Sequence, residues 1–213
     1  YNRKKLNILV AGCGSDQAAI IAKCNPLHQI TGIDLSKESI KNQQKLKDNH
    51  KINNLKLICG DFREIEFNEK FDYIISTGVI HHLDNPETAL KYFYSNLKDE
   101  GVINLMVYGD KKSHSLNEIK KIFKNLNLEY DKKSIEIAKN TILNLNNKHP
   151  TKIFTNDIND LKYEAGIVDL LLHKNENFYS ISNLIKLLDS NKLIIKNFYD
   201  GKISSITKFF LYD

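Results

Sequence analysis

Two glycines and an aspartate near the start of the chain outline a nucleoside-binding site. An apolar stretch that begins at Ile8 runs through Ala11 into Gly12 and Gly14, and Asp34 follows twenty residues after Gly14. Glycine adopts backbone angles closed to other residues and lets a ligand come close to the main chain. A carboxylate at the position of Asp34 suits the two hydroxyls of a ribose. The alternative is a tight strand-to-helix turn that binds nothing.

The residues after Gly14 discriminate between two cofactor classes. A dinucleotide fingerprint has a third glycine where this chain has Gln17, so that the pyrophosphate rests on a helix N-terminus. Asp16 would repel a pyrophosphate, but it would tolerate or favour the ammonium and sulfonium charges of S-adenosylmethionine. We therefore expect S-adenosylmethionine as the cofactor.

Further candidate residues follow two later strands. Asp61 and Phe62 come after the predicted strand at 55–59, and we expect their carboxylate and ring to hold the edge and the face of an adenine. The segment Thr77-Gly78-Val79 follows the apolar stretch that begins at Phe71. In an open parallel sheet, ligands lie outside the carboxyl ends of the strands, where all of these residues are expected to gather.

This order of segments resembles the class I S-adenosylmethionine-dependent methyltransferases. Residues 8–108 follow the motif order of that family without a gap, and the run from Phe71-Asp72 to His81-His82-Leu83-Asp84-Asn85-Pro86 is the most specific match. The resemblance implies methyl transfer to an acceptor. Many members carry glycine where this chain has Asp16. This departure from the family pattern concerns the affinity for the cofactor. The resemblance implies cofactor-binding roles for Ala11, Gly12, Cys13, Gly14, Asp16, Asp34, Leu35, Asp61, Phe62, Thr77, Gly78 and Val79.

A later segment is similar to one subgroup of the family. The block from Asp169 to Tyr179, followed by a helix over 180–189 and a closing strand, looks like the methyltransferase domains often joined to tetratricopeptide repeats. This similarity implies a reaction type and names no acceptor.

Histidines and tyrosines supply the candidates for catalysis. Methyl transfer is an in-line displacement at an activated carbon, so alignment and exclusion of water can provide much of the rate. A hydroxyl or protonated amine acceptor also needs a base, for which His81 and His82 are candidates, with at most one of these neighbours facing the substrate. Tyr108 is a candidate for orienting the acceptor. Each of these three residues is equally compatible with a packing role.

Two more pocket candidates come from the later block, and no metal is expected. His173 and Tyr179 could reach the same pocket as His82 and Tyr108, which makes these four the candidate substrate residues. The neighbouring histidines and Asp84 lack the spacing that brings ligands together on one ion.

The order of predicted elements favours an α/β fold. Strands near 7–11, 28–33, 55–59, 71–76, 101–108, 192–198 and 204–212 predict a doubly wound, seven-stranded, mostly parallel sheet with helices on both faces and a C-terminal antiparallel hairpin. The helices between the first strands are expected at 16–23, 36–50 and 86–97, with Ser36 as a cap and Pro86 in a first turn. We interpret residues 1–213 as a single methyltransferase domain. Residues 113–165 form a helical insertion within it, either a lid over the acceptor or a packing or partner surface.

Composition bears on the partners and the cellular compartment that we expect for this chain. The net charge is +5, but only Arg3 and Arg63 are arginine among 31 basic residues, and scattered lysines favour a solvated surface over nucleic-acid binding. The three cysteines form no Cys-x-x-Cys pair, which is typical of reduced thiols in the cytoplasm. No apolar run approaches the ~20 residues of a membrane span. The first strand begins soon after Tyr1, so a preceding domain is compatible with the sequence.

Three functions remain open on the sequence. The first is methyl transfer to a small molecule. The second is a cofactor-binding module without chemistry of its own, and the third is a methyltransferase acting on protein or RNA. Thr77-Gly78-Val79 stands where an Asn/Asp-Pro-Pro-Tyr motif often serves amide or nucleobase nitrogens, which argues against nucleobase-amine chemistry.

Overall fold

The computed structural model describes residues 5–156, 159–173 and 177–198. The chain divides into two compact units. The sheet unit comprises residues 1–80, 85–106 and 184–213, and the helical unit comprises residues 81–84 and 107–183. The segment 113–165, expected to be a helical insertion, lies within the helical unit.

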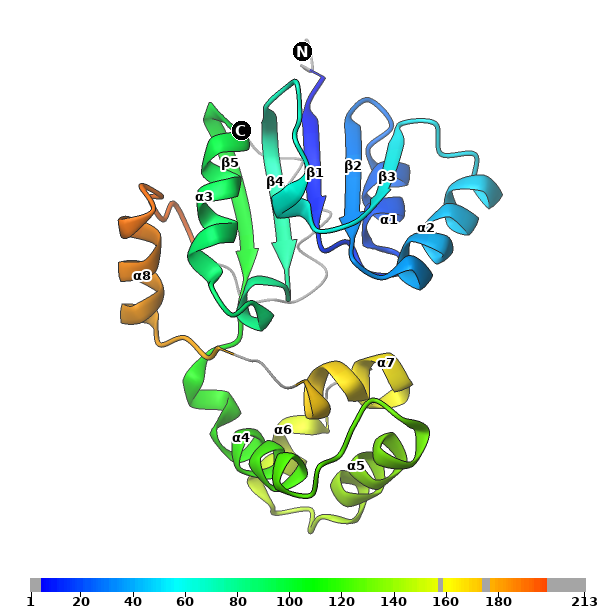
Figure 1. The fold of residues 1–213 in the computed structure, drawn as a ribbon, viewed down its shortest axis with the longest axis vertical. Helices are drawn as coiled ribbons and strands as arrows, with labels where there is room; N and C mark the ends of the chain where they lie inside the picture. Colours follow the sequence, from blue (N-terminus) through cyan, green and yellow to red (C-terminus); the bar gives the residue numbers. More distant parts are fainter. Residues whose placement is uncertain (1–4, 157–158, 174–176, 199–213) are drawn as a thin grey trace. The chain divides into compact units, whose positions relative to one another are not determined.

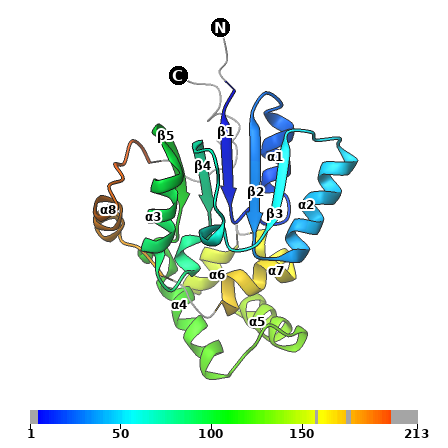
Figure 2. The same ribbon diagram turned by 45° about the horizontal axis from the view of Figure 1, so that its top comes forward.

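Five parallel strands form the sheet, in the order β3-β2-β1-β4-β5 (Figure 1). Their bounds are β1 Asn7–Ala11, β2 Gln29–Asp34, β3 Leu55–Cys59, β4 Phe71–Thr77 and β5 Leu97–Met106. β1 lies at the centre, with β2 and β4 paired on either side of it (Figure 2). The strand order reverses between β1 and β4, and such a switch point is where ligands bind in open α/β sheets.

The prediction of seven strands was wrong for the part of the chain that the structure describes. There the sheet has five strands, all parallel, and residues 192–198 form no strand of a terminal hairpin. Ile194 in that segment is 79% exposed, and no strand among the described residues pairs with the segment. A strand is stabilised by such pairing. The last strand, expected at 204–212, lies outside the described residues.

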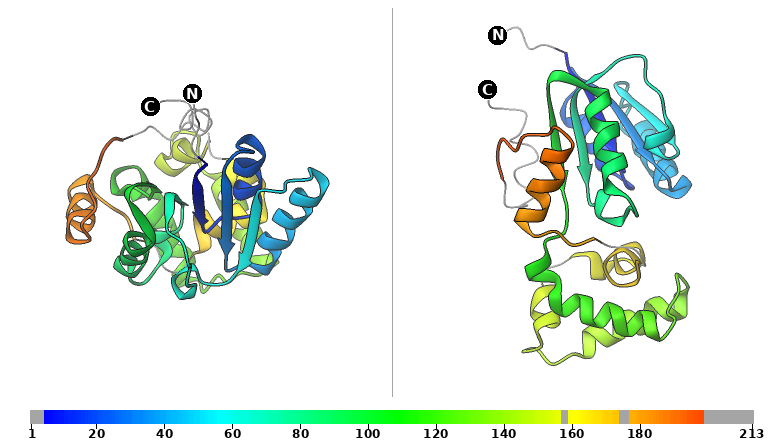
Figure 3. Two further views of the ribbon diagram at one scale, coloured as in Figure 1. Left: turned by 90° about the horizontal axis from the view of Figure 1, so that it is seen from above. Right: turned by 60° about the vertical axis from the view of Figure 1, so that its left-hand side comes forward.

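Helices cover both faces of the sheet, as expected. α1 (Gln17–Cys24) and α3 (Pro86–Asn96) lie on opposite faces (Figure 3), and α2 (Lys37–Asn49) contacts α1, β2 and β3. The predicted helix starts are confirmed: the Ser36 side chain accepts a hydrogen bond from the backbone of Ser39, and Pro86 occupies the first turn of α3. Two short 3-10 turns, Phe62–Glu64 and Ile80–His82, follow β3 and β4.

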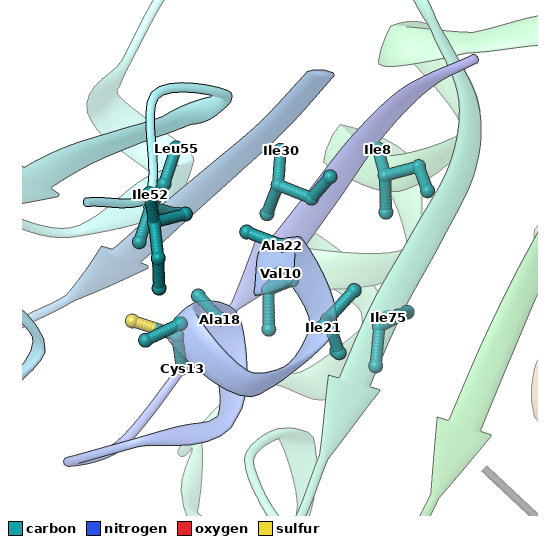
Figure 4. Close-up of a cluster of buried hydrophobic side chains, with 11 residues drawn as sticks. Ile8, Val10, Cys13, Ala18, Ile21, Ala22, Ile30, Ile52, Leu55 and Ile75 are labelled. Atoms are coloured by element: carbon teal, nitrogen blue, oxygen red, sulfur yellow. The ribbon is translucent and has the colours of Figure 1, made fainter. Parts of the chain in front are cut away.

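The core of the sheet unit follows from the alternation along β1. Ile8 and Val10 point toward α1, and Leu9 points to the opposite face and is fully buried. The cluster on the α1 side is drawn in Figure 4. It contains Ile8, Val10, Cys13, Ala18, Ala19, Ile21, Ala22, Ile30, Ile52, Leu55 and Ile75. This packing holds the loop after β1 against α1.

The helical unit has a separate core. Its helices are α4 (Asp110–Asn125), α5 (Lys132–Asn144), α6 (Pro150–Thr155) and α7 (Glu164–Ile167), with a 3-10 turn at Asn159–Lys162 and a π-helical turn at Val168–Leu172. α8 (Ile181–Ser190) begins in the helical unit and ends in the sheet unit. The core is made of Leu116, Ile119, Phe123, Ala138, Ile142, Ile167, Leu170, Leu171 and Leu172. Among the described helices, none has the length and apolarity needed to cross a membrane.

Candidate active site

The glycine loop after β1 needs glycine at both expected positions. Gly12 and Gly14 have φ of +72° and +57°, in the left-handed region that side chains disfavour. A Cβ on Gly12 would clash with the Val79 side chain, whereas a Cβ on Gly14 would meet nothing within 4 Å. Gly12 therefore serves packing between the loops after β1 and β4. Gly14 borders open space, which a ligand can use.

Three backbone donors of this loop are already used within the protein. The N–H groups of Gly12 and Cys13 both donate to the carbonyl of Ile33, each at 2.9 Å. The N–H of Gly14 donates to Oδ2 of Asp34 at 2.8 Å. A pyrophosphate needs such donors directed at the ligand. These three donors are therefore not available to a phosphate, in agreement with the choice of cofactor made from Asp16.

Asp34 joins three loops at the carboxyl edge of the sheet. Its Oδ2 holds Gly14, its Oδ1 accepts the N–H of Ser36 at 2.8 Å, and its backbone carbonyl accepts the N–H of Gly60 at 2.9 Å. A carboxylate has about four acceptor positions. Two of them remain for the hydroxyls of a ribose, so the geometry fits the expected role.

Gln43 is a site residue that the sequence interpretation missed. Its side chain, fully buried on α2, donates to the carbonyls of Cys13 (2.9 Å) and Gly14 (3.0 Å). Its Oε1 accepts the N–H of Ala19 in the first turn of α1 at 2.8 Å. Asp16, the N-cap of α1, makes no side-chain cap, so Gln43 supplies one from a distance. The available signal was a polar residue at helical spacing from Ile40, on the apolar face of that helix.

Other predicted cofactor residues near the loop differ in exposure. Ala11 and Cys13 are buried, and burial together with the charge of Asp34 raises the pKa of the Cys13 thiol to about 12. Cys13 is therefore a small apolar packing residue rather than a reactive thiol. Leu35 is 69% exposed directly after β2, which leaves its side chain available to an apolar ring.

The segment after β3 corrects one expectation. The Phe62 ring is buried and packs on Phe93 and Tyr92, with centroid distances of 5.3 and 5.6 Å, so it belongs to the core instead of offering a face to adenine. Asp61 lies at the carboxyl edge as expected. Its carboxylate is bound by Arg63, with Nη2 of Arg63 2.6 Å from Oδ2.

The end of β4 and the loop after it lie at the same edge of the sheet as the glycine loop. Thr77 is the last residue of β4, and Gly78 has φ of +75° and donates its N–H to the carbonyl of Met106 at 3.2 Å. Val79 packs on Gly12. The structure thus brings the predicted residues after β1, β2, β3 and β4 to one edge of the sheet unit.

A second cluster, the imidazole cluster, lies within the helical unit. It comprises His81, His82, His173 and Tyr108, four of the residues proposed for catalysis or substrate binding. The ring of His82 lies between the rings of His81 and His173, with centroid distances of 4.1 and 3.9 Å. Tyr108 lies 4.2 Å from His81. Segments far apart in sequence therefore place these four rings together.

His81 is completely buried in this cluster. Neither of its ring nitrogens has a hydrogen-bond partner within the described part of the chain. Burial, and then the neighbouring His82, lower the pKa of His81 to about 3. The ring is therefore neutral at physiological pH.

Two further residues support the imidazole cluster and were not predicted. Oδ1 of Asp169 lies 2.9 Å from Nε2 of His82. Asn177 holds the loop that carries the histidines, because its backbone N–H donates to the carbonyl of His81 at 2.7 Å and its side chain donates to that of Leu83 at 2.8 Å. The spacing of four between Asp169 and His173 was the available signal, since such residues share a helix face.

Tyr179 belongs to the helical unit and is held there by two backbone hydrogen bonds. Its N–H donates to the carbonyl of Tyr108 at 2.9 Å, and its carbonyl accepts the N–H of Asp110 at 3.1 Å. Its hydroxyl is buried without a hydrogen-bond partner among the described residues, and burial raises the pKa of Tyr179.

Comparison with known proteins decides the family. A family model described as a methyltransferase domain matches residues 2–128, more than half of the chain. This chain belongs to the methyltransferase-domain family. The match confirms the predicted resemblance to class I S-adenosylmethionine-dependent methyltransferases. It does not extend to the subgroup joined to tetratricopeptide repeats, for which the similarity stays a prediction.

Individual methyltransferases resemble about half of the chain. The malonyl-[acyl-carrier protein] O-methyltransferase of Priestia megaterium is 29% identical over 111 residues, which are 52% of this chain and 39% of that protein. The mitochondrial ubiquinone biosynthesis O-methyltransferase of Dictyostelium discoideum is 29% identical over 108 residues, 46% of this chain and 34% of that protein. The chain therefore spans well under half of the curated relatives that it matches.

Among solved structures, one is similar in fold to nearly the whole of this chain. PKMT2 from Rickettsia typhi in complex with AdoHcy superimposes with a TM-score of 0.65 and 20% sequence identity, covering 96% of this chain and 44% of that one. This likeness confirms the α/β methyltransferase fold.

Proposed function

We propose that this methyltransferase domain transfers a methyl group from S-adenosylmethionine to a small-molecule acceptor. The observation that carries the proposal is the use of the glycine-loop donors: Gly12, Cys13 and Gly14 all donate within the protein, so the loop offers carboxylates and open space instead of a phosphate cradle. S-adenosylmethionine, when bound, supplies a methyl carbon activated by the sulfonium charge.

The sheet unit would hold the cofactor through groups already in position. Asp34 has two acceptor positions left for the ribose hydroxyls, and Leu35 offers an exposed apolar side chain to the base. Asp61 would accept a hydrogen bond from the edge of the base in exchange for its present contact with Arg63. Asp16 would add negative potential near the ammonium and sulfonium charges. Gln43 would keep the loop in its observed conformation.

The names of the relatives support a small organic acceptor. Several act, by name, on malonyl-[acyl-carrier protein], and others serve ubiquinone biosynthesis or methylate (S)-coclaurine. These acceptors share no single scaffold. The relatives therefore favour a small organic acceptor, or one presented on a carrier, without naming it for this chain. We also keep both proposals for residues 113–165, a lid over the acceptor or a packing or partner surface.

Within the imidazole cluster, we assign the base to His82. A pKa of about 3 makes His81 a weak base near neutrality, where an effective general base has a pKa close to the working pH. His82 has a carboxylate partner in Asp169. The Asp169 carboxylate beside Nε2 can orient this imidazole toward the acceptor. Tyr108, His173 and Tyr179 are proposed to orient the acceptor.

The three cysteines are consistent with the proposed cytoplasmic location. All of them are free thiols, and Cys24 and Cys59 are exposed. Exposed thiols persist in a reducing compartment.

Direct measurement of cofactor binding tests the proposal. Isothermal titration with S-adenosylmethionine should show binding to the wild-type chain, and Asp34→Ala or Gly14→Val should abolish it. Glu100→Ala, which removes an exposed carboxylate on β5, should leave binding unchanged. Wild-type protein without measurable binding, or Asp34→Ala and Gly14→Val both binding like wild type, would refute the cofactor assignment.

Labelled cofactor then tests the acceptor class. The wild-type chain is incubated with methyl-labelled S-adenosylmethionine and a cell extract, and the products are separated by size. We expect the label in the small-molecule fraction. Label in macromolecules alone would replace the proposed acceptor by protein or RNA, and binding without any transfer would indicate a cofactor-binding module.

A further inference from the structure

Arg63 takes up the whole carboxylate of Asp61. Oδ1 of Asp61 accepts the backbone N–H of Arg63 at 2.9 Å and Nε of Arg63 at 3.0 Å. Oδ2 accepts Nε at 3.2 Å and Nη2 at 2.6 Å. These contacts account for the roughly four acceptor positions of a carboxylate. The 6-amino group of an adenine would find no acceptor on Asp61 in this arrangement.

Protonation of Asp61 does not release the guanidinium of Arg63, because the carboxylate stays ionised. The hydrogen bond from Arg63 lowers the pKa of Asp61 even though burial acts in the opposite direction. The carboxylate is therefore ionised at physiological pH, and charge-assisted contacts of this kind are among the stronger hydrogen bonds. A competing donor has to displace the Arg63 side chain itself.

The surrounding loop is held independently of the guanidinium. The backbone N–H of Arg63 donates to the side chain of Asp61, the N-cap of the 3-10 turn. The Tyr92 hydroxyl donates to the carbonyl of Ile65 at 2.9 Å, and the Phe62 ring is buried. The Arg63 side chain is one-third exposed, and its Nη1 lies 3.4 Å from Thr88 Oγ1. The guanidinium can therefore leave while the loop keeps its shape.

We propose that Arg63 determines the affinity and base specificity of the cofactor site, because its guanidinium competes with the 6-amino group of adenine for Asp61. This inference rests on the proposed placement of adenine at Asp61. Binding of an adenine then requires Arg63 to release the carboxylate, and the cost of that release weakens cofactor affinity.

The contact between Arg63 and Asp61 also predicts how the site discriminates between adenine and hypoxanthine. Adenine presents a hydrogen-bond donor at position 6, whereas hypoxanthine presents a carbonyl acceptor there. A guanidinium that stays near Asp61 offers donors only, which suit the carbonyl. Arg63 should therefore reduce the discrimination between the two bases, and its removal should increase it.

Isothermal titration of the full chain with S-adenosylhomocysteine and S-inosylhomocysteine tests the proposal. Arg63→Ala keeps the backbone cap on Asp61 and removes only the competitor. We expect it to bind S-adenosylhomocysteine about two- to fivefold more tightly than wild type, the range of an exposed ion pair. We expect its affinity for S-inosylhomocysteine to be equal or weaker, so the ratio of the two affinities rises.

Lys70→Ala is the matched control, because it removes one exposed positive charge before β4, at the opposite edge of the sheet. It should leave both affinities unchanged. Weaker binding of S-adenosylhomocysteine to Arg63→Ala, or an unchanged ratio in a variant that circular dichroism shows to be folded, would overturn the proposal. These results differ from a failure of the proposed function, in which the wild-type chain binds neither compound.

Discussion

Nε2 of His82 lies 2.9 Å from Oδ1 of Asp169, and this contact joins the loop after β4 to the π-helical turn of the helical unit. Burial is the largest single influence on Asp169 and acts to raise its pKa, but the contact with His82 and the neighbouring imidazoles of His81 and His173 together lower that pKa. The other charged or titratable groups near this pair include His81, His173, Tyr108 and, on α4, Lys120. Asp169 is therefore an ionised partner that can orient the imidazole.

Loss of either partner should reduce methyl transfer without changing cofactor affinity, since the proposed cofactor residues belong to the sheet unit. His82→Gln should lower the rate by about 10²- to 10⁴-fold, the usual range for a general base. Asp169→Asn should lower it by a smaller factor. Both can be measured with methyl-labelled cofactor, alongside titration with S-adenosylhomocysteine. Glu164→Gln, an exposed carboxylate on α7, is the control, and unchanged transfer in His82→Gln would remove this residue from the base role.

His81 should make the folded state sensitive to mild acid. With a pKa of about 3 in the folded chain and 6.5 ordinarily, its imidazole binds a proton only after unfolding between those values. Stability should then fall as the pH drops from about 6.5 toward 3, by at most about 1.4 kcal/mol per pH unit from this group. Urea unfolding at pH 7 and pH 5 measures it. His81→Leu should flatten the dependence, and the exposed His50→Gln should not; equal slopes for wild type and His81→Leu would contradict the assignment.

Gln43 should matter for both stability and cofactor binding. Gln43→Leu leaves two carbonyls and one N–H of the loop and α1 without their partner, each worth about 1–3 kcal/mol when buried. We expect a loss of a few kcal/mol in urea unfolding and weaker binding of S-adenosylmethionine. The neighbouring Gln44→Ala loses only an exposed contact to Asp48 and should change stability by less than about 0.5 kcal/mol. A Gln43→Leu chain with wild-type affinity would show that the loop needs no support from α2.

Gly12 and Val79 should be coupled. Gly12→Ala forces a side chain into the left-handed region and against the Val79 side chain, so it should cost more than the roughly 1–2 kcal/mol of backbone strain. Val79→Ala combined with Gly12→Ala should recover the steric part only. A double-mutant cycle in urea unfolding measures this, and strictly additive effects would mean that the two loops do not press on each other.

Local patterns were sufficient for the parts of the fold that depend on neighbouring residues. The glycines after β1, the aspartate after β2, the Ser36 cap and Pro86 at the start of α3 could all be read from the chain, because turn geometry and capping are decided within a few residues. The strand predicted at 192–198 was wrong because strand formation depends on residues far away along the chain. Its apolar residues suit a strand, but a strand also needs a partner, which a local pattern does not contain.

The sequence by itself determined the chemistry available at the sheet edge: the positive-φ glycines, the acidic Asp16 and Asp34, and the family to which they belong. Only the tertiary structure decided how those groups are engaged. It placed Gln43 under the glycine loop, turned Phe62 into the core, set Arg63 on Asp61 and paired Asp169 with His82. Contacts of this kind join groups on different elements or depend on side-chain direction. They are set by packing, which no spacing along the chain encodes.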